Sequence, residues 1–245
     1  MAGHSKWANI KHKKAANDKK RGKLWSKLIK EVTVAARQGG GEVSANPRLR
    51  LAIDKAKAGN MPNDTIDRAV KRGAGGEDNG HFDEIRYEGY APGGIAILVD
   101  CLTDNRNRTA SEVRHAFTKH GGNLGTDGSV AYLFQKQGIL SYAPGANEEA
   151  LLELALELGA DDVVGHDDES VDVYTRAETF HTIHEGLITA DQVPDHAEIT
   201  FTADTQISLS GELADKVLRL IDFLEDLDDV QTVYTNADLT SDAAD

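Results

Sequence analysis

Charge is divided unequally along this chain of 245 residues, and the division limits how the chain can fold. The first 72 residues hold eighteen lysines and arginines against six acidic residues, whereas the remainder holds nine against thirty-five. The formal net charge of the whole chain is -14. A basic segment joined to an acidic remainder indicates parts with different surfaces, and a lysine-rich segment is typical of proteins with a polyanionic partner.

Length and composition bound the class of protein. A chain of 245 residues can form two or three domains, and 40% hydrophobic with 28% charged residues indicates a soluble globular protein. The longest apolar run, Ile95–Val99, is far too short to span a bilayer, so we expect no membrane association. The basic N-terminus lacks the apolar segment of a secretory signal, and a single cysteine excludes an internal disulfide. We therefore expect a cytoplasmic protein.

The basic part of the chain is predicted to be helical. Residues 1–15 have no apolar period and are expected to form an extended arm. Apolar residues then recur with helical spacing in three segments, which are 17–38, 46–59 and 63–73. Asn17 or Asp18, Asn46 and Asn63 are the expected N-caps, and glycines are expected to end each helix. The glycine-rich stretch 73–83 is the predicted linker to the rest of the chain.

The acidic part is predicted to alternate strands and helices. The expected strands are 85–90, 95–102, 130–134, 138–142, a pair on either side of 167–169, 198–202, 206–210 and 230–235. The expected helices are 108–119, 148–158, 180–188 and 212–227. A β-α-β-β-α-β order favours α+β, ferredoxin-like layers with helices on one face of an antiparallel sheet. The chain has enough material for two such units.

The N-terminal arm carries the predicted nucleic-acid site. Ammonium groups neutralise phosphates and release counterions, and an aromatic ring can stack on an unpaired base. The candidate residues of this segment are Lys6, Trp7, Lys11, His12, Lys13, Lys14, Lys19, Lys20, Arg21 and Lys23. Two alternatives stay open: lysines 19–30 can simply be a solvated helix face, and Trp7 can dock on its own domain. Trp25, in contrast, is predicted to pack in the helical core.

A second basic spot completes the candidate site. Arg106 and Arg108 lie at the N-terminal end of a predicted helix, where cations oppose the helix macrodipole. Contact with phosphate or RNA is one explanation for this placement. The alternative is ion pairing with a nearby acid, Asp104 or Glu112.

The sequence gives little support for a catalytic or metal-binding site. Cys101 lies within an apolar strand and is expected to be buried and inert. His181 and His184 are three residues apart on a helix but have no evident third ligand, and residues 167–169 are expected to form an exposed hairpin tip. The segment Gly121–Gly128 has the glycines of a phosphate loop without its lysine. We predict no enzymatic activity, no metal and no cofactor.

Several long motifs resemble the YebC family. They are AGHSKWANIKHKKAA at residues 2–16, the phrase 63–73, EGYAPGG, DNRNRT, EVRHAF and GGNLGTDGSVAYLF within 88–134, and LEDLDDVQTVYTN near the C-terminus. The resemblance covers essentially the full length. It implies a helical N-terminal domain and two α+β domains, the third inserted in the second, with no enzymatic activity and a cytoplasmic location. The expected domains are residues 1–75, residues 82–134 with 203–240, and residues 135–202.

The resemblance also implies a role in gene expression. Bacterial members are labelled transcriptional regulators that bind DNA, mitochondrial members are translational activators, and a ribosome-associated role has been argued for bacteria. The chemistry of the chain leaves both nucleic acids open. Arg68, Lys71 and Arg72 gather at the C-terminal end of the third helix, whereas a DNA recognition helix usually presents its N-terminal residues. A lysine-rich arm is closer to tails that enter folded RNA.

Three functions are therefore weighed: a duplex-DNA regulator, a factor that binds ribosomal RNA or the ribosome, and an acidic protein–protein adaptor. We predict a non-enzymatic, nucleic-acid-binding regulator of gene expression. The sequence does not define its oligomeric state, although a monomer is favoured.

Overall fold

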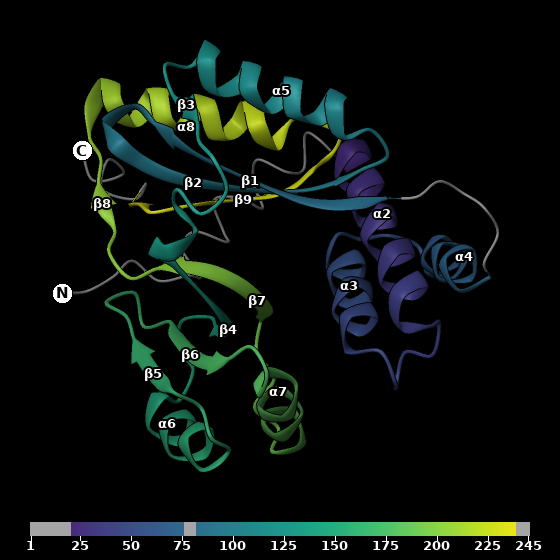
Figure 1. The fold of residues 1–245 in the computed structure, drawn as a ribbon. Helices are drawn as coiled ribbons and strands as arrows, with labels where there is room; N and C mark the ends of the chain where they lie inside the picture. The colour runs from purple at the N-terminus through teal and green to yellow at the C-terminus, as the bar shows by residue number, and fades with distance from the viewer. Residues whose placement is uncertain (1–20, 76–81, 239–245) are drawn as a thin grey trace. The chain divides into compact units, whose positions relative to one another are not determined.

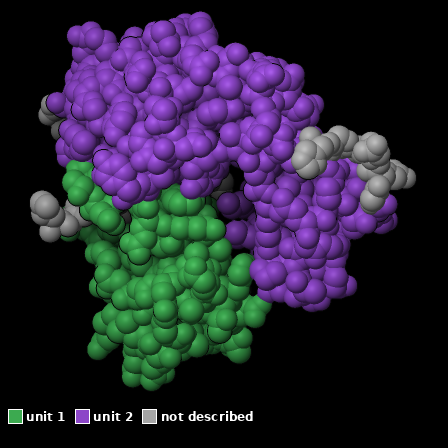
Figure 2. Space-filling model, in the orientation of Figure 1, with its two compact units in different colours: residues 1–16, 134–206 green, residues 17–133, 207–245 purple. Residues whose placement is uncertain are grey.

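The computed structural model describes residues 21–75 and 82–238, which form two compact units (Figures 1 and 2). Residues 134–206 form one unit. The described residues before and after this insertion form the other. The α+β fold class is confirmed, with seven α-helices in the described residues. None of the helices in these two stretches is long and apolar enough to cross a membrane.

Three helices form a small module in the larger unit: α2 (Arg21–Gly39), α3 (Pro47–Ala58) and α4 (Asn63–Ala74). Their buried core is made by small and branched residues, among them Val32, Ala36, Leu49, Ala52, Ile66 and Ala69. Trp25 packs against this core as predicted, and its indole nitrogen donates to the Gly59 carbonyl at 2.9 Å. We call residues 21–75 the helical module. The predicted caps at Asn17 and Asp18 lie outside the described residues.

Asn46 explains how α3 begins. Its side-chain oxygen accepts from the Leu49 amide at 3.0 Å, which is the expected N-cap contact. Its side-chain nitrogen donates to the carbonyls of Ala35 and Gly40, both at 2.8 Å. One buried amide therefore starts α3 and ties it to the end of α2.

The predicted end of the third helix at Gly73 is wrong, because α4 continues to Ala74. Gly73 is buried, and a Cβ atom there would clash with the Thr33 carbonyl and with the Ala36 side chain. This glycine lets α4 approach α2 closely instead of ending the helix.

The rest of the larger unit is a four-stranded antiparallel sheet in the order β3-β1-β2-β9. The strands are β1 (Asp83–Ala91), β2 (Ile95–Thr103), β3 (Asn123–Leu124) and β9 (Val230–Thr235). Helices α5 (Arg106–Lys119) and α8 (Gly211–Glu225) cover one face (Figure 1). Alternate residues of β2 enter the core between sheet and helices, together with Val113, Phe117, Val217 and Leu220. The α+β part of the larger unit begins with two consecutive strands, β1 and β2, before α5. It therefore differs from the predicted β-α-β-β-α-β order, in which a helix follows the first strand.

Two short strands close this unit. Strand β8 (Ile207–Ser208) pairs in parallel with β10 (Ala237–Asp238), so the predicted strand 206–210 is shorter than expected. The predicted strand 130–134 is wrong: residues Ala131–Leu133 form a 3-10 turn, η3. A second 3-10 turn, η2 (Pro92–Gly94), connects β1 to β2 at the Pro-Gly-Gly sequence.

The smaller unit has the predicted β-α-β-β-α-β order. Its elements are β4 (Phe134–Tyr142), α6 (Glu148–Glu157), β5 (Asp162–Gly165), β6 (Val171–Arg176), α7 (Phe180–Thr189) and β7 (His196–Ala203). The antiparallel sheet has the order β5-β6-β4-β7. Buried residues come from the sheet and from both helices, including Ile139, Leu151, Val173, Phe180 and Leu187. The predicted division of the whole chain into three domains stays a prediction.

Candidate nucleic-acid interface

Most of the predicted arm residues lie outside the described part of the chain. These are Lys6, Trp7, Lys11, His12, Lys13, Lys14, Lys19 and Lys20, together with the side chain of Arg21. The structure places three candidate side chains, those of Lys23, Arg106 and Arg108.

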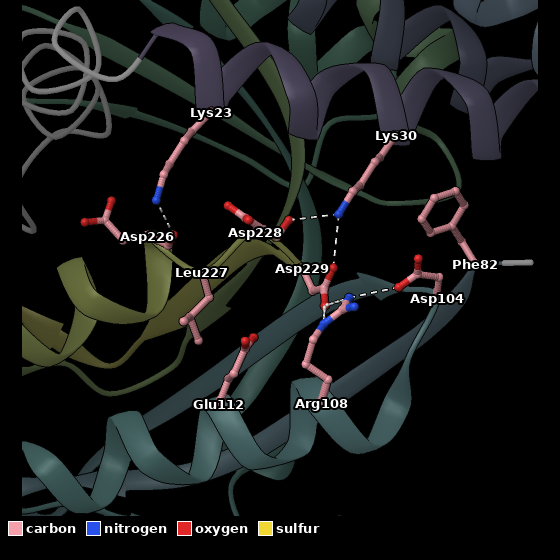
Figure 3. A pocket seen from close by; sticks show the side chains of 10 residues that line it. All are labelled: Lys23, Lys30, Phe82, Asp104, Arg108, Glu112, Asp226, Leu227, Asp228 and Asp229. Atoms are coloured by element: carbon pink, nitrogen blue, oxygen red, sulfur yellow. Dashed lines mark hydrogen bonds and ion pairs between the residues drawn. The ribbon is translucent and has the colours of Figure 1, made fainter. Parts of the chain in front are cut away.

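Lys23 belongs to a row of lysines along one face of α2. Lys27 and Lys30 follow at the spacing of successive helical turns, and all three reach the turn that joins α8 to β9 (Figure 3 draws Lys23 and Lys30). Lys23 donates to the Asp226 carbonyl at 3.0 Å and Lys27 to the Glu225 carbonyl at 2.5 Å. Lys30 donates to the Asp228 carbonyl at 3.0 Å. We call Lys23, Lys27 and Lys30 the lysine row.

Lys23 and Lys27 contact the negative end of helix α8. The last carbonyl groups of α8 have no partner within the helix, and the macrodipole concentrates negative charge there. Burial acts to lower the pKa of Lys27, and nearby Glu225 and Asp226 raise it; burial prevails, so the pKa lies below its ordinary value. Part of the basic segment is therefore engaged by the protein itself, an arrangement that the sequence did not indicate.

Asp229 gathers a second set of cations and hydroxyls. Its buried carboxylate accepts from Arg108 at 2.6 Å, from Thr109 at 2.9 Å and from Lys30 at 3.1 Å. Burial alone raises the pKa of this carboxyl, but the hydrogen bonds from Arg108, Lys30 and Thr109 outweigh it and hold the pKa below its ordinary value. Asp229 therefore stays ionised at the junction of α2, α5 and β9.

The two arginines of α5 differ in their surroundings. Arg108 pairs with Asp104 at 2.8 Å, as one of the two predicted alternatives had it, and also with Asp229. Arg106 is more exposed, with its Nε 3.6 Å from Asp83. The sequence did not predict the contact between Arg108 and Asp229, because the two residues are 121 positions apart. Of the two arginines, Arg106 has the more accessible charge.

A polar pocket of about 490 Å³ lies beside these contacts (Figure 3). Its lining carries both signs of charge: Lys23, Lys30, Arg108, Asp104, Glu112, Asp226, Asp228 and Asp229, with Phe82 and Leu227. Five carboxylates against three cations do not favour an anionic ligand inside the pocket.

Two family models match the chain. The model described as the TACO1/YebC protein N-terminal domain matches residues 5–76, and the model of the TACO1/YebC second and third domain matches residues 82–237. This chain belongs to the TACO1/YebC family. The resemblance seen in the sequence motifs is confirmed.

Two relatives with similar sequences are both named as probable transcriptional regulators. A "Probable transcriptional regulatory protein" of Francisella philomiragia is 62% identical over 240 residues, which cover 98% of this chain and 97% of that protein. One of Francisella tularensis subsp. novicida is 63% identical with the same coverage. The crystal structure of a conserved hypothetical protein from Aquifex aeolicus has a TM-score of 0.84 and 48% identity, and covers 98% of this chain and 100% of that one.

In this TACO1/YebC chain, a carboxylate of the chain itself binds the end of the glycine-rich loop. Glu88, buried on β1, accepts from the Gly128 amide at 2.7 Å and from the Val130 and Ala131 amides at 2.8 Å. Burial acts to raise the pKa of Glu88, but these three hydrogen bonds lower it further than burial raises it. These three hydrogen bonds hold residues 128–131 against β1.

The other candidates for chemistry are placed as follows. Cys101 is buried in β2, and burial raises its pKa to about 12, so the thiol is unreactive at neutral pH. His181 and His184 lie on α7, where both rings contact Phe180. In the two described stretches, no group of three His, Cys, Asp or Glu residues is arranged to hold a metal ion.

Proposed function

We propose that this protein regulates gene expression by binding nucleic acid through its basic N-terminal segment, residues 1–30, without catalysing a reaction. The observation that carries the proposal is the distribution of charge. Residues 1–21 hold seven lysines and arginines against one acid, in a chain whose net charge is -14. A polyanion is repelled by most of this protein and attracted by that segment.

Duplex DNA is the first candidate ligand, since the related Francisella proteins are named as transcriptional regulators. RNA, including ribosomal RNA, is the second, and two observations favour it. Trp7 stands among the arm lysines, where an aromatic ring can stack on an unpaired base. In addition, Arg68, Lys71 and Arg72 lie toward the C-terminal end of α4, whereas a DNA recognition helix usually presents its N-terminal residues.

The salt dependence of binding tests the role of the arm. In the full chain, lysines 6, 11, 13, 14, 19 and 20 are replaced by glutamine, and binding to a labelled duplex is measured between 50 and 300 mM KCl by fluorescence anisotropy. The slope of log affinity against log salt should become shallower by about 0.9 for each phosphate that the variant no longer neutralises. The control replaces two exposed lysines elsewhere, Lys57 on α3 and Lys136 on β4. An unchanged slope in the arm variant would refute the proposal.

Competition decides between the two ligands. Labelled ribosomal RNA bound at 150 mM KCl is challenged with duplex DNA at equal phosphate concentration. Efficient displacement supports the DNA regulator, and retention against excess duplex supports the RNA factor. If neither nucleic acid binds, the proposed function fails and a protein-binding adaptor takes its place.

A further inference from the structure

The helical module and the α+β part of the same unit have separate apolar cores. The core of the module and the core between the sheet and helices α5 and α8 share no residue. Long polar side chains connect the two parts instead. The lysine row reaches the end of α8, and Gln38 and Arg48 both donate to the Glu84 carboxylate, at 2.6 and 2.8 Å. We call this set of contacts the polar seam.

A seam of this kind can open at small cost. Ammonium groups that contact carbonyls and carboxylates near the surface gain little net free energy, and salt screens them. Domain interfaces resist relative motion only when they are large and hydrophobic. The helical module keeps its own core when the seam opens, so release does not require unfolding.

The groups that accept from the lysine row keep other partners, or can bind water, when the lysines leave. When Lys30 leaves, Asp229 loses the donor to Oδ1 but keeps Arg108, Thr103 and Thr109 as donors to Oδ2, so the buried carboxylate still has its charged partner. The acceptors of Lys23 and Lys27 are carbonyl groups at the end of α8, which water can solvate. On the other side, Lys27 recovers the hydration that burial removes.

The lysine row also continues the basic segment to which the proposed function assigns nucleic-acid binding. Phosphate groups and the α8–β9 turn compete for the same ammonium groups, since both are anionic and both accept hydrogen bonds. We propose that the α8–β9 turn, residues 225–229, holds the lysine row in a closed state, and that phosphates of a bound nucleic acid displace the turn and open the seam. This inference rests on the proposed function and adds its regulation.

The test measures the separation of the two parts during binding. Cysteines for a dye pair are introduced at Ala58→Cys on α3 and Ser111→Cys on α5, both exposed, while the native Cys101 is buried. Energy transfer and the anisotropy of a 20-nucleotide single-stranded RNA are followed in the same full-chain sample at 50 mM KCl. We expect energy transfer to fall as the RNA binds.

Charge variants identify the turn as the competitor. Asp226→Asn with Asp228→Asn keeps the carbonyl acceptors of the lysine row but removes two negative charges beside it. We expect RNA binding to tighten about three- to tenfold relative to the control, because each charge near the surface contributes weakly. The control, Asp215→Asn with Asp222→Asn, removes the same charge from earlier exposed positions of α8.

Two failures are distinguishable. If RNA binds with constant energy transfer, and both double variants bind equally well, the closed state is refuted and the proposed function stands. If the anisotropy shows no binding of RNA, and duplex DNA does not bind either, the proposed function fails together with the displacement that rests on it.

Discussion

The interior of the helical module and the polar seam hold the same three helices by different means. Inside, Leu49, Ala52 and Ile66 are buried among apolar neighbours, and Gly73 allows α4 to approach α2 closely. At the seam, ammonium and guanidinium groups reach carbonyls and carboxylates. Apolar burial is insensitive to salt and costly to undo, whereas charged contacts near the surface are weak and screened. The module is therefore built to stay folded while its attachment changes.

Truncating the core of the module should have the largest effect. Leu49→Ala removes a fully buried side chain and leaves a cavity, so we expect a loss of about 2 to 5 kcal/mol in the free energy of unfolding, measured with urea. Leu218→Ala on α8, where the side chain is 38% exposed, is the control and should cost much less. Equal losses in the two variants would contradict the assignment of a tight core to the module.

Asp229 lies between the two extremes, because it is buried and charged. Asp229→Asn keeps the shape but removes the charge that Arg108 and Lys30 pair with, and we expect a loss of about 1.5 to 3 kcal/mol by urea unfolding at pH 7. Asp228→Asn, at the exposed neighbouring position, is the control and should change stability little. If the two variants unfold at the same urea concentration, Asp229 is not the centre of this junction.

The same carboxyl gives stability a defined pH dependence. The pKa of Asp229 is lower in the folded protein than its ordinary value of 3.8, so its contribution is complete above that value and is lost as the pH falls through the folded pKa. The difference between wild type and Asp229→Asn should therefore be constant near neutral pH and shrink below about pH 4. A difference that grows in acid would show that the sign is wrong.

Changing the seam should have the smallest effect on stability. Lys27→Met retains the length of the side chain and removes its charge, so we expect a change below about 1 kcal/mol in urea. Opening of the polar seam by salt should respond more strongly. With dyes at Ala58→Cys and Ser111→Cys, we expect energy transfer in the Lys27→Met variant to fall at a lower KCl concentration than in the wild type. Lys57→Met on the exposed face of α3 is the control and should leave that dependence unchanged.

Local patterns predicted most of the fold. The apolar rhythm located α3, and Asn46 before Pro47 marked its start correctly, because capping depends on neighbouring residues only. The strand predicted at residues 130–134 is wrong, although the apolar residues of this segment are typical of a strand. Glu88 takes the amides of Val130 and Ala131, which are then unavailable to a strand ladder, and Tyr132 is left 72% exposed.

The site was less predictable than the fold, for a related reason. The pairing of Arg108 with Asp104 spans one helical turn and could be expected from the sequence. The partners of the lysine row are about 200 residues away along the chain, and no local pattern relates them to α2. The charge pattern predicted that this surface of α2 is basic. Only the tertiary structure shows that the α8–β9 turn binds it.

The insertion of residues 134–206 begins and ends on neighbouring strands, where Phe134 is the register partner of Ala203. Once this small sheet has formed, the two points where the chain leaves and re-enters the larger unit are pinned together. The chain entropy of a loop of that length is then already lost before β9 searches for β2. The larger unit can therefore complete its sheet as though its sequence were much shorter, which favours early folding of the insertion.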